Sequence, residues 1–151
     1  MIELEELKNQ DIFNPKYLFH GTAHEIEKIE CNRSTDNMNK DNEEKAIFLT
    51  SSIFTAAAYA FSRKLKEIND YYSFSMNNDG KLPAMTLEVE NLPEDLFGYI
   101  YIFEKDSDMI KGNYHYTTQY KCYHDLIPQK VVKVNYKDFE DYFERRNYHN
   151  L

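Results

Sequence analysis

The hexapeptide YLFHGT, residues 17–22, decides how the rest of the chain can be arranged. Its apolar and aromatic residues predict a short strand that ends at His20, and Gly21 follows directly. The chain has only 4 glycines in 151 residues, so this glycine indicates a place where a ligand or another strand approaches the backbone closely. A strand over residues 17–20 with a histidine at its end is therefore the first expected element.

The strongest helix pattern follows a second short strand. AIFLT, residues 46–50, has the composition of a buried strand, and SSIFTAAAYAFSRKLKEI, residues 51–68, repeats apolar residues at helical spacing after a capping Ser51 or Ser52. Tyr59 falls roughly opposite the apolar stripe of this helix. The stripe consists of Ile53, Ala57, Phe61, Leu65 and Ile68, widened by Phe54 and Ala58.

Weaker patterns predict the remaining elements. They are an opening helical turn with Leu4 and Leu7 on one side, a helix from Thr22 with Ile26 and Ile29 inward, a mobile polar loop over 32–45, strands within 84–90, 98–104, 117–125 and 130–136, and an amphipathic closing helix over 137–146 with Phe139, Tyr142 and Phe143 inward. The intervals between strands are too short for repeated βαβ crossovers. We expect an α+β fold with a mostly antiparallel sheet, in a single domain over residues 1–151.

Composition excludes several classes of function. A formal net charge of −8 with scattered Lys and Arg disfavours general nucleic-acid binding. No apolar run approaches the ~20 residues that cross a bilayer, and the acidic start MIELEELKNQ is unlike a signal peptide, so we expect a cytoplasmic protein with no membrane partner. Cys31 and Cys122 lack the spacing of a zinc site, so we expect free thiols and no metal.

Three residues are candidates for chemistry, each with an ordinary alternative. His20 ends a strand beside Gly21, but it can also be a core histidine with a satisfied hydrogen bond. Tyr59 stands among small residues and can present its ring to a flat ligand, or it can be half-buried against a loop. Strand alternation places Gln119 on one face with Lys121, and alone it is a polar strand residue.

Taken in order, YLFHGT, IFLTSSIFTAAAYA and TQYKCY resemble the ADP-ribosyltransferase fold of diphtheria toxin type, found in poly(ADP-ribose) polymerases and rifampicin ADP-ribosyltransferases. The resemblance spans roughly residues 17–136. It implies a split, mostly antiparallel sheet with flanking helices, and NAD as the substrate. It also implies NAD contacts from His20, Gly21 and Thr22, and stacking of the nicotinamide ring between Phe48 and Tyr59.

Two positions depart from the family pattern. Phe48 stands where the family has a tyrosine, and Gln119 stands where it has the glutamate that stabilises the cationic transition state. An amide offers no full charge, and loss of one such electrostatic group often costs ~10² in rate. The rifampicin-type enzymes look to carry an aspartate in a segment after the central strand instead. The matching run here is EVENLPEDLF, which makes Glu94 or Asp95 a candidate replacement acid. The alternative role for this pair is to favour a short helix after Pro93.

The leading expectation is therefore transfer of ADP-ribose from NAD to an unknown acceptor, with release of nicotinamide. The acceptor class is open between protein, nucleic acid and small molecule. A second reading keeps the fold as a catalytically impaired module that binds NAD, ADP-ribose or a protein partner. A third is an RNA 2′-phosphotransferase, whose family also has a His-Gly-Thr strand end but needs more arginines for its phosphates than this chain offers.

Overall fold

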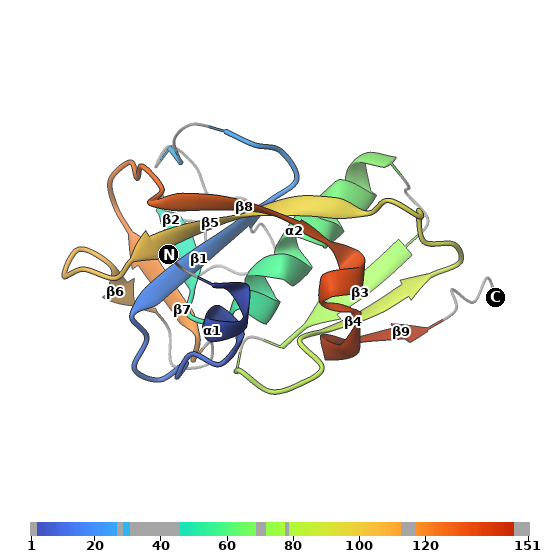
Figure 1. Cartoon of the computed structure of the whole chain (residues 1–151), viewed down its shortest axis with the longest axis horizontal. Coiled ribbons are helices and arrows are strands. Elements are labelled where there is room, and N and C mark those ends of the chain that lie inside the picture. The colour runs from blue at the N-terminus through green and yellow to red at the C-terminus, as the bar shows by residue number, and fades with distance from the viewer. Residues whose placement is uncertain are drawn as a thin grey trace.

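The computed structural model describes residues 3–26, 29–30, 46–68, 72–77, 79–112 and 117–146. These residues form a mixed α+β fold in which a long helix lies between two sheets (Figure 1). The larger sheet has the order β6-β7-β2-β1-β5-β8 and the smaller one the order β3-β4-β9. The elements are α1 (Leu4–Lys8), β1 (Tyr17–Thr22), β2 (Ile47–Thr50), α2 (Ile53–Ile68), β3 (Tyr72–Met76), β4 (Met85–Val89), β5 (Phe97–Glu104), β6 (Ile110–Lys111), β7 (Gln119–Cys122), β8 (Lys130–Asn135), two 3₁₀ turns (Tyr136–Asp138 and Glu140–Tyr142) and β9 (Phe143–Arg146).

The pairing of the strands is almost entirely antiparallel. Every neighbouring pair in the larger sheet is antiparallel, and so is β3 with β4, whereas β9 runs parallel to β4. The expected α+β class with mostly antiparallel strands is therefore confirmed. The strands predicted within 17–20, 46–50, 84–90, 98–104, 117–125 and 130–136 are all present, while β3 and the short β6 had no predicted counterpart.

Helix α2 lies unusually close to the larger sheet because two glycines face it. A Cβ atom at Gly21 of β1 would stand 1.9 Å from the carbonyl oxygen of Ala56, and one at Gly98 of β5 would stand 2.7 Å from the Cβ of Ala60. Both alanines are fully buried. The segment that approaches the backbone of Gly21 is thus this helix.

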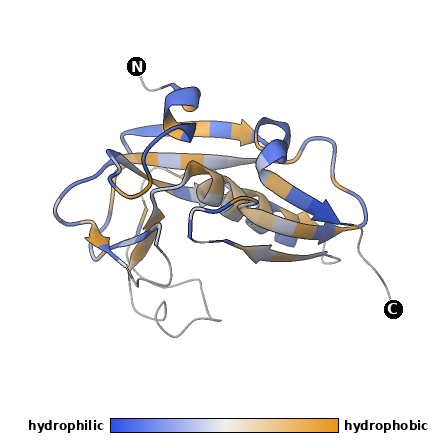
Figure 2. Cartoon of the chain, turned by 90° about the horizontal axis from the view of Figure 1, so that it is seen from below, coloured by the Kyte–Doolittle hydropathy of each residue, from blue (hydrophilic) through white to orange (hydrophobic). Residues whose placement is uncertain are grey.

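Two apolar cores hold the layers together. One fills the space between the sheets and contains most of the predicted α2 stripe, joined by Met85, Leu87, Phe139 and others. The second covers the opposite face of the larger sheet and includes Leu18, Leu49, Tyr101, Tyr120 and Cys122. Figure 2 shows apolar positions along the strands and hydrophilic residues prevailing in the connecting turns. Ile68, predicted inward, is 53% exposed at the end of the helix.

Helix α2 begins as predicted. The hydroxyl oxygen of Ser52 accepts a hydrogen bond from the Thr55 backbone N–H at 3.3 Å, which satisfies one of the free donors of the first turn. The opening helical turn is also present, with Leu7 buried.

The helix predicted from Thr22 is wrong for the described part of that segment. Instead of helical bonds, the hydroxyl of Tyr101 accepts from the Ile26 N–H and donates to the His24 carbonyl at 3.1 Å, and the Thr22 hydroxyl donates to the same carbonyl at 2.5 Å. Ile29 then forms an antiparallel bridge with Leu126. These distant partners satisfy the backbone groups that a helix would have used.

The closing helix over 137–146 is also wrong. Two 3₁₀ turns carry the chain past Phe139, and residues 143–146 then join β4 as a third strand, with Met85 paired to Phe143. The capping box of Asn135 and Asp138 starts the first turn. The expected inward direction is nevertheless confirmed for Phe139 and Phe143, which are buried, and Tyr142 packs against the same core.

Two expectations fall on residues that the structure does not describe, namely the 32–45 loop and the Cys31 thiol. Cys122 is a buried thiol, and its Sγ donates to the His124 carbonyl at 3.7 Å. Among the described residues, no helix is long and apolar enough to pass through a bilayer.

Candidate functional site

His20 lies where β1 and β2 separate. The two strands share one register pair, Phe19 with Thr50, whereas β1 pairs with β5 along its whole length. Beyond that pair the His20 side chain bridges the strands, because its Nδ1 lies 2.8 Å from the carbonyl oxygen of Phe48. The histidine therefore takes the place of a ladder hydrogen bond at the point of separation.

The hydrogen bond of His20 determines its protonation. A carbonyl oxygen can only accept, so Nδ1 carries the proton and the neutral ring presents Nε2 as an acceptor. Burial, with a further contribution from the nearby Arg63 charge, lowers the pKa of His20 to about 4, although the bond to Phe48 opposes the shift. At neutral pH the imidazole is uncharged, and part of its surface remains exposed.

The side chain of Arg63 connects helix α2 to β1 next to His20. Its Nη1 donates to the carbonyl oxygen of Gly21 at 3.2 Å, and its guanidinium carbon lies 5.9 Å from the centre of the Tyr59 ring one helical turn earlier. Burial lowers the pKa of Arg63, and the nearby Tyr59 opposes that shift. We call His20, Gly21, Phe48, Tyr59 and Arg63 the His20 cluster.

Two predicted contacts of the dinucleotide have other partners. The ring of Phe48 is half-buried, and Lys121 Nζ lies 5.8 Å from its centre. The Thr22 hydroxyl donates to the His24 carbonyl in the turn after β1. Phe48 thus keeps an accessible ring beside a cation, whereas Thr22 has a local structural role.

Gln119 lies two strands from β1. It pairs with Thr50 of β2, which pairs with Phe19, so about 10 Å separates its backbone from β1. Register places Gln119 on the same face as Gly21 and as Lys121. Its side chain also packs against Gly112, where an added Cβ would stand 3.0 Å from the amide oxygen. Gln119 therefore lies on the strand next to β2, which carries Phe48 of the His20 cluster.

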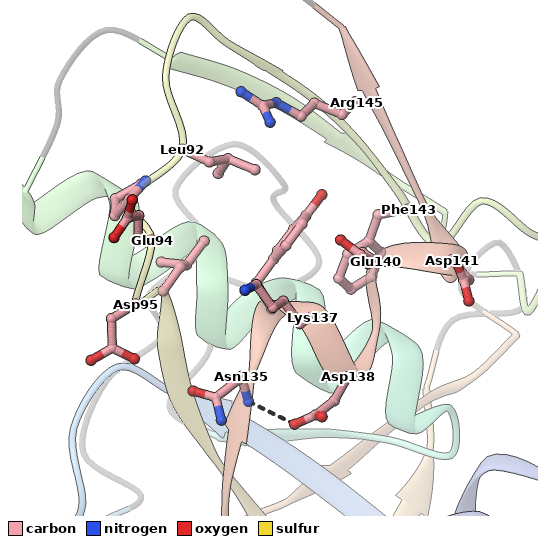
Figure 3. Close-up of a pocket in the computed structure, with 13 residues that line it drawn as sticks. Leu92, Glu94, Asp95, Asn135, Lys137, Asp138, Glu140, Asp141, Phe143 and Arg145 are labelled. Atoms are coloured by element: carbon pink, nitrogen blue, oxygen red, sulfur yellow. Dashed lines mark hydrogen bonds between the residues drawn. The ribbon is translucent and has the colours of Figure 1, made fainter.

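The replacement acids lie elsewhere. Glu94 and Asp95 are exposed in the turn before β5, where they line a separate cavity (Figure 3). The register partner of His20 on β5 is Tyr101, six residues beyond Asp95. The structure does not bring Asp95 to the His20 cluster.

Arg63 is the residue of the cluster that sequence reasoning left without a role. Its position four residues after Tyr59 on a helix was the available indication, since side chains at that spacing lie together. Whether its guanidinium would turn toward the strand end depended on how closely α2 approaches Gly21, and this is a tertiary property.

Stability is predicted to fall as the pH is lowered from about 6.5 to about 4. In this interval the unfolded His20 binds a proton that the folded one does not, so the unfolded state is favoured as pH falls. Allowing for the partial exposure of the ring, we expect a loss of about 2 kcal/mol. Urea unfolding at several pH values should show a flatter dependence for His20→Asn, which keeps a donor for Phe48. An unchanged pH dependence in that variant would contradict the assignment.

Comparison with known proteins adds no relative: no family model, curated protein or solved structure matches this chain. Within the described ranges, no group of three or more His, Cys, Asp or Glu side chains is placed to hold a metal ion. The geometry of the His20 cluster and the motif resemblance are therefore the two indications of function in this chain.

Proposed function

We propose that the chain binds NAD at the His20 cluster and transfers its ADP-ribose slowly, with release of nicotinamide. The single observation that carries this proposal is the placement of a planar cation at the cluster. The Arg63 guanidinium donates to the Gly21 carbonyl while it lies near the Tyr59 ring. A nicotinamide ring linked to ribose is also planar and cationic, and its amide can donate the same hydrogen bond.

The neutral His20 supports the same ligand. Its Nδ1–H is occupied by Phe48, so Nε2 is left as an acceptor suited to a ribose hydroxyl. The separation of β1 from β2 after Phe19 and Thr50 further supports the split sheet that the resemblance implies. Each of these features is local, and together they support the proposal that NAD binds at the His20 cluster.

Slow turnover is expected because Gln119, the register partner of Thr50, stands where the family has its catalytic glutamate. Gln119 is neutral and Asp95 lies outside the cluster, so neither of these two candidate positions supplies a carboxylate to stabilise a cationic transition state. This arrangement favours a second candidate function, an NAD- or ADP-ribose-binding module without useful catalysis. For the RNA 2′-phosphotransferase hypothesis, Arg63 is an arginine in the His20 cluster that could bind a phosphate. Arg145 and Arg146 lie on β9 in the smaller sheet.

Binding of labelled NAD to the purified chain tests the proposal. We expect the parent protein to bind NAD, and His20→Ala and Tyr59→Ala each to weaken binding about tenfold, since each removes a hydrogen bond or a ring contact. Isothermal titration gives the Kd values, and chromatography of the products shows whether nicotinamide is released. Failure of the folded parent protein to bind NAD at millimolar concentration would end the proposal.

Arg63→Met is a matched variant that is expected to strengthen NAD binding, whereas His20→Ala and Tyr59→Ala weaken it. The substitution keeps an apolar stem of similar length but frees the Gly21 carbonyl, so NAD should bind more tightly than in the parent. Weaker binding in this variant would instead assign Arg63 to a phosphate of the ligand.

A further inference from the structure

A large cavity opens between residues 92–96 and residues 135–145 (Figure 3). Its volume is about 1130 Å³, which is slightly above the usual range for small-molecule sites. It shares no residue with the His20 cluster. We call it the Tyr136 cavity, after one of the residues that line it.

Tyr136 is held rigidly but has an unused polar group. Its ring packs 5.6 Å from the centre of Phe61 and 5.7 Å from that of Phe143, and the residue is only 9% exposed. Among the described residues, none hydrogen-bonds to its hydroxyl. Burial raises its pKa, Arg145 lowers it and Glu140 raises it, so both cavity residues lie near the hydroxyl. The hydroxyl is not closed off from solvent, because Tyr136 lines the cavity, and a ligand in the cavity can therefore hydrogen-bond to it.

The charges around the cavity select for a cation. Its lining carries the carboxylates of Glu94, Asp95, Asp138, Glu140 and Asp141 against the cations of Lys137 and Arg145. Asp138 accepts from the Asn135 backbone N–H at 3.1 Å and so has a structural role. In Figure 3, Glu94 and Asp95 stand on one wall, and Glu140 stands on the other. The remaining negative charges therefore surround the opening from both sides.

We propose that the Tyr136 cavity binds an organic cation, namely an ammonium or guanidinium group carried on an apolar body. The apolar part contacts Leu92 and Phe143, and the cationic group lies among the carboxylates and donates to the Tyr136 hydroxyl. Such a group occurs in free amines and in the basic side chains of peptides. The cavity and its ligand are independent of NAD binding.

Matched probes test the charge requirement in solution. The full-length ¹⁵N-labelled chain is titrated with 4-phenylbutylamine, 4-phenylbutanol and 4-phenylbutyrate, which share one body but are cationic, neutral and anionic. The amine is expected to bind at least tenfold more tightly than the other two and to shift the resonances of residues 92–96 and 135–145. Equal affinities, or shifts confined to other regions, would overturn the proposal. N-acetyl-Phe-Arg-amide as a further probe shows whether a peptide source binds better than the free amine.

Variants assign the binding to named groups. Tyr136→Phe removes only the hydroxyl and should raise the Kd of the amine three- to tenfold. Glu94→Gln with Asp95→Asn should raise it about tenfold and reduce its dependence on salt. Glu104→Gln with Asp106→Asn makes the same change in net charge at the opposite, exposed end of β5 and should leave the Kd unchanged. If this control weakens binding as much as the cavity variant, the attraction is a property of the whole surface and the proposal is wrong.

Discussion

Gly21→Ala is expected to destabilise the chain by about 4 kcal/mol or more, enough to unfold a domain of ordinary stability. The added Cβ would stand 1.9 Å from the carbonyl oxygen of Ala56 and 2.9 Å from its carbonyl carbon. Both atoms belong to the backbone of α2, so no side-chain rotation relieves the overlap and the helix must move off β1. Urea or thermal unfolding followed by circular dichroism measures the effect. A loss below about 1 kcal/mol would show that α2 is not seated this closely.

Gly98 provides the matched control for this mechanism. Its added Cβ would meet the Cβ of Ala60 at 2.7 Å, which is a side-chain atom that can be deleted. Gly98→Ala should therefore destabilise the chain less than Gly21→Ala, and adding Ala60→Gly should restore part of the loss. Ala56→Gly should give no such rescue of Gly21→Ala, because the obstructing atoms remain.

The strands and the long helix could be predicted because their patterns are local. Alternation in β7 places Tyr120 and Cys122 inward and leaves Gln119 and Lys121 half-exposed, as two-residue periodicity requires. The stripe of α2 repeats at helical spacing, and most of it faces the core between the sheets. What the stripe did not reveal is the burial of its other side, where Ala56 and Ala60 meet two glycines that lie far apart in the sequence.

The two wrong helices were decided by distant partners. The segment after β1 is fixed by the hydroxyl of Tyr101, which is 75 residues from Ile26. The segment 143–146 becomes a strand because β4 offers an edge, and pairing with it satisfies backbone groups on both segments. A helical spacing of aromatic residues correctly placed Phe139 and Phe143 inward, but it could not show which backbone geometry would bury them.

The sequence indicated which residues of the site matter, but not which element packs against them. His20 was singled out because a strand was predicted to end there, beside a glycine. That predicted end is wrong, since β1 continues to Thr22, but the structure does place His20 where β1 separates from β2. The approach predicted at Gly21 is real, but the approaching segment is α2, and the Gly21 carbonyl already accepts from Arg63. Glycine at this position is therefore required by packing whether or not NAD binds. The fit of a dinucleotide has to be judged from His20, Tyr59 and Phe48.

The chemistry of the proposed reaction can be tested by restoring the missing charge. Gln119→Glu is expected to raise the rate of nicotinamide release about 10²-fold, because a carboxylate on this strand stabilises the cationic transition state where a neutral amide cannot. Glutamate has nearly the shape of glutamine, and Lys121 on the same face favours its charged form. Quantified nicotinamide release compares the parent, Gln119→Glu and Gln119→Ala. The double variant His20→Ala with Gln119→Glu should lose the gain if both residues serve one ligand. NAD binding that persists without any acceleration would favour the binding module over the enzyme, because the amide would then occupy a row of the sheet that the reacting ribose does not reach.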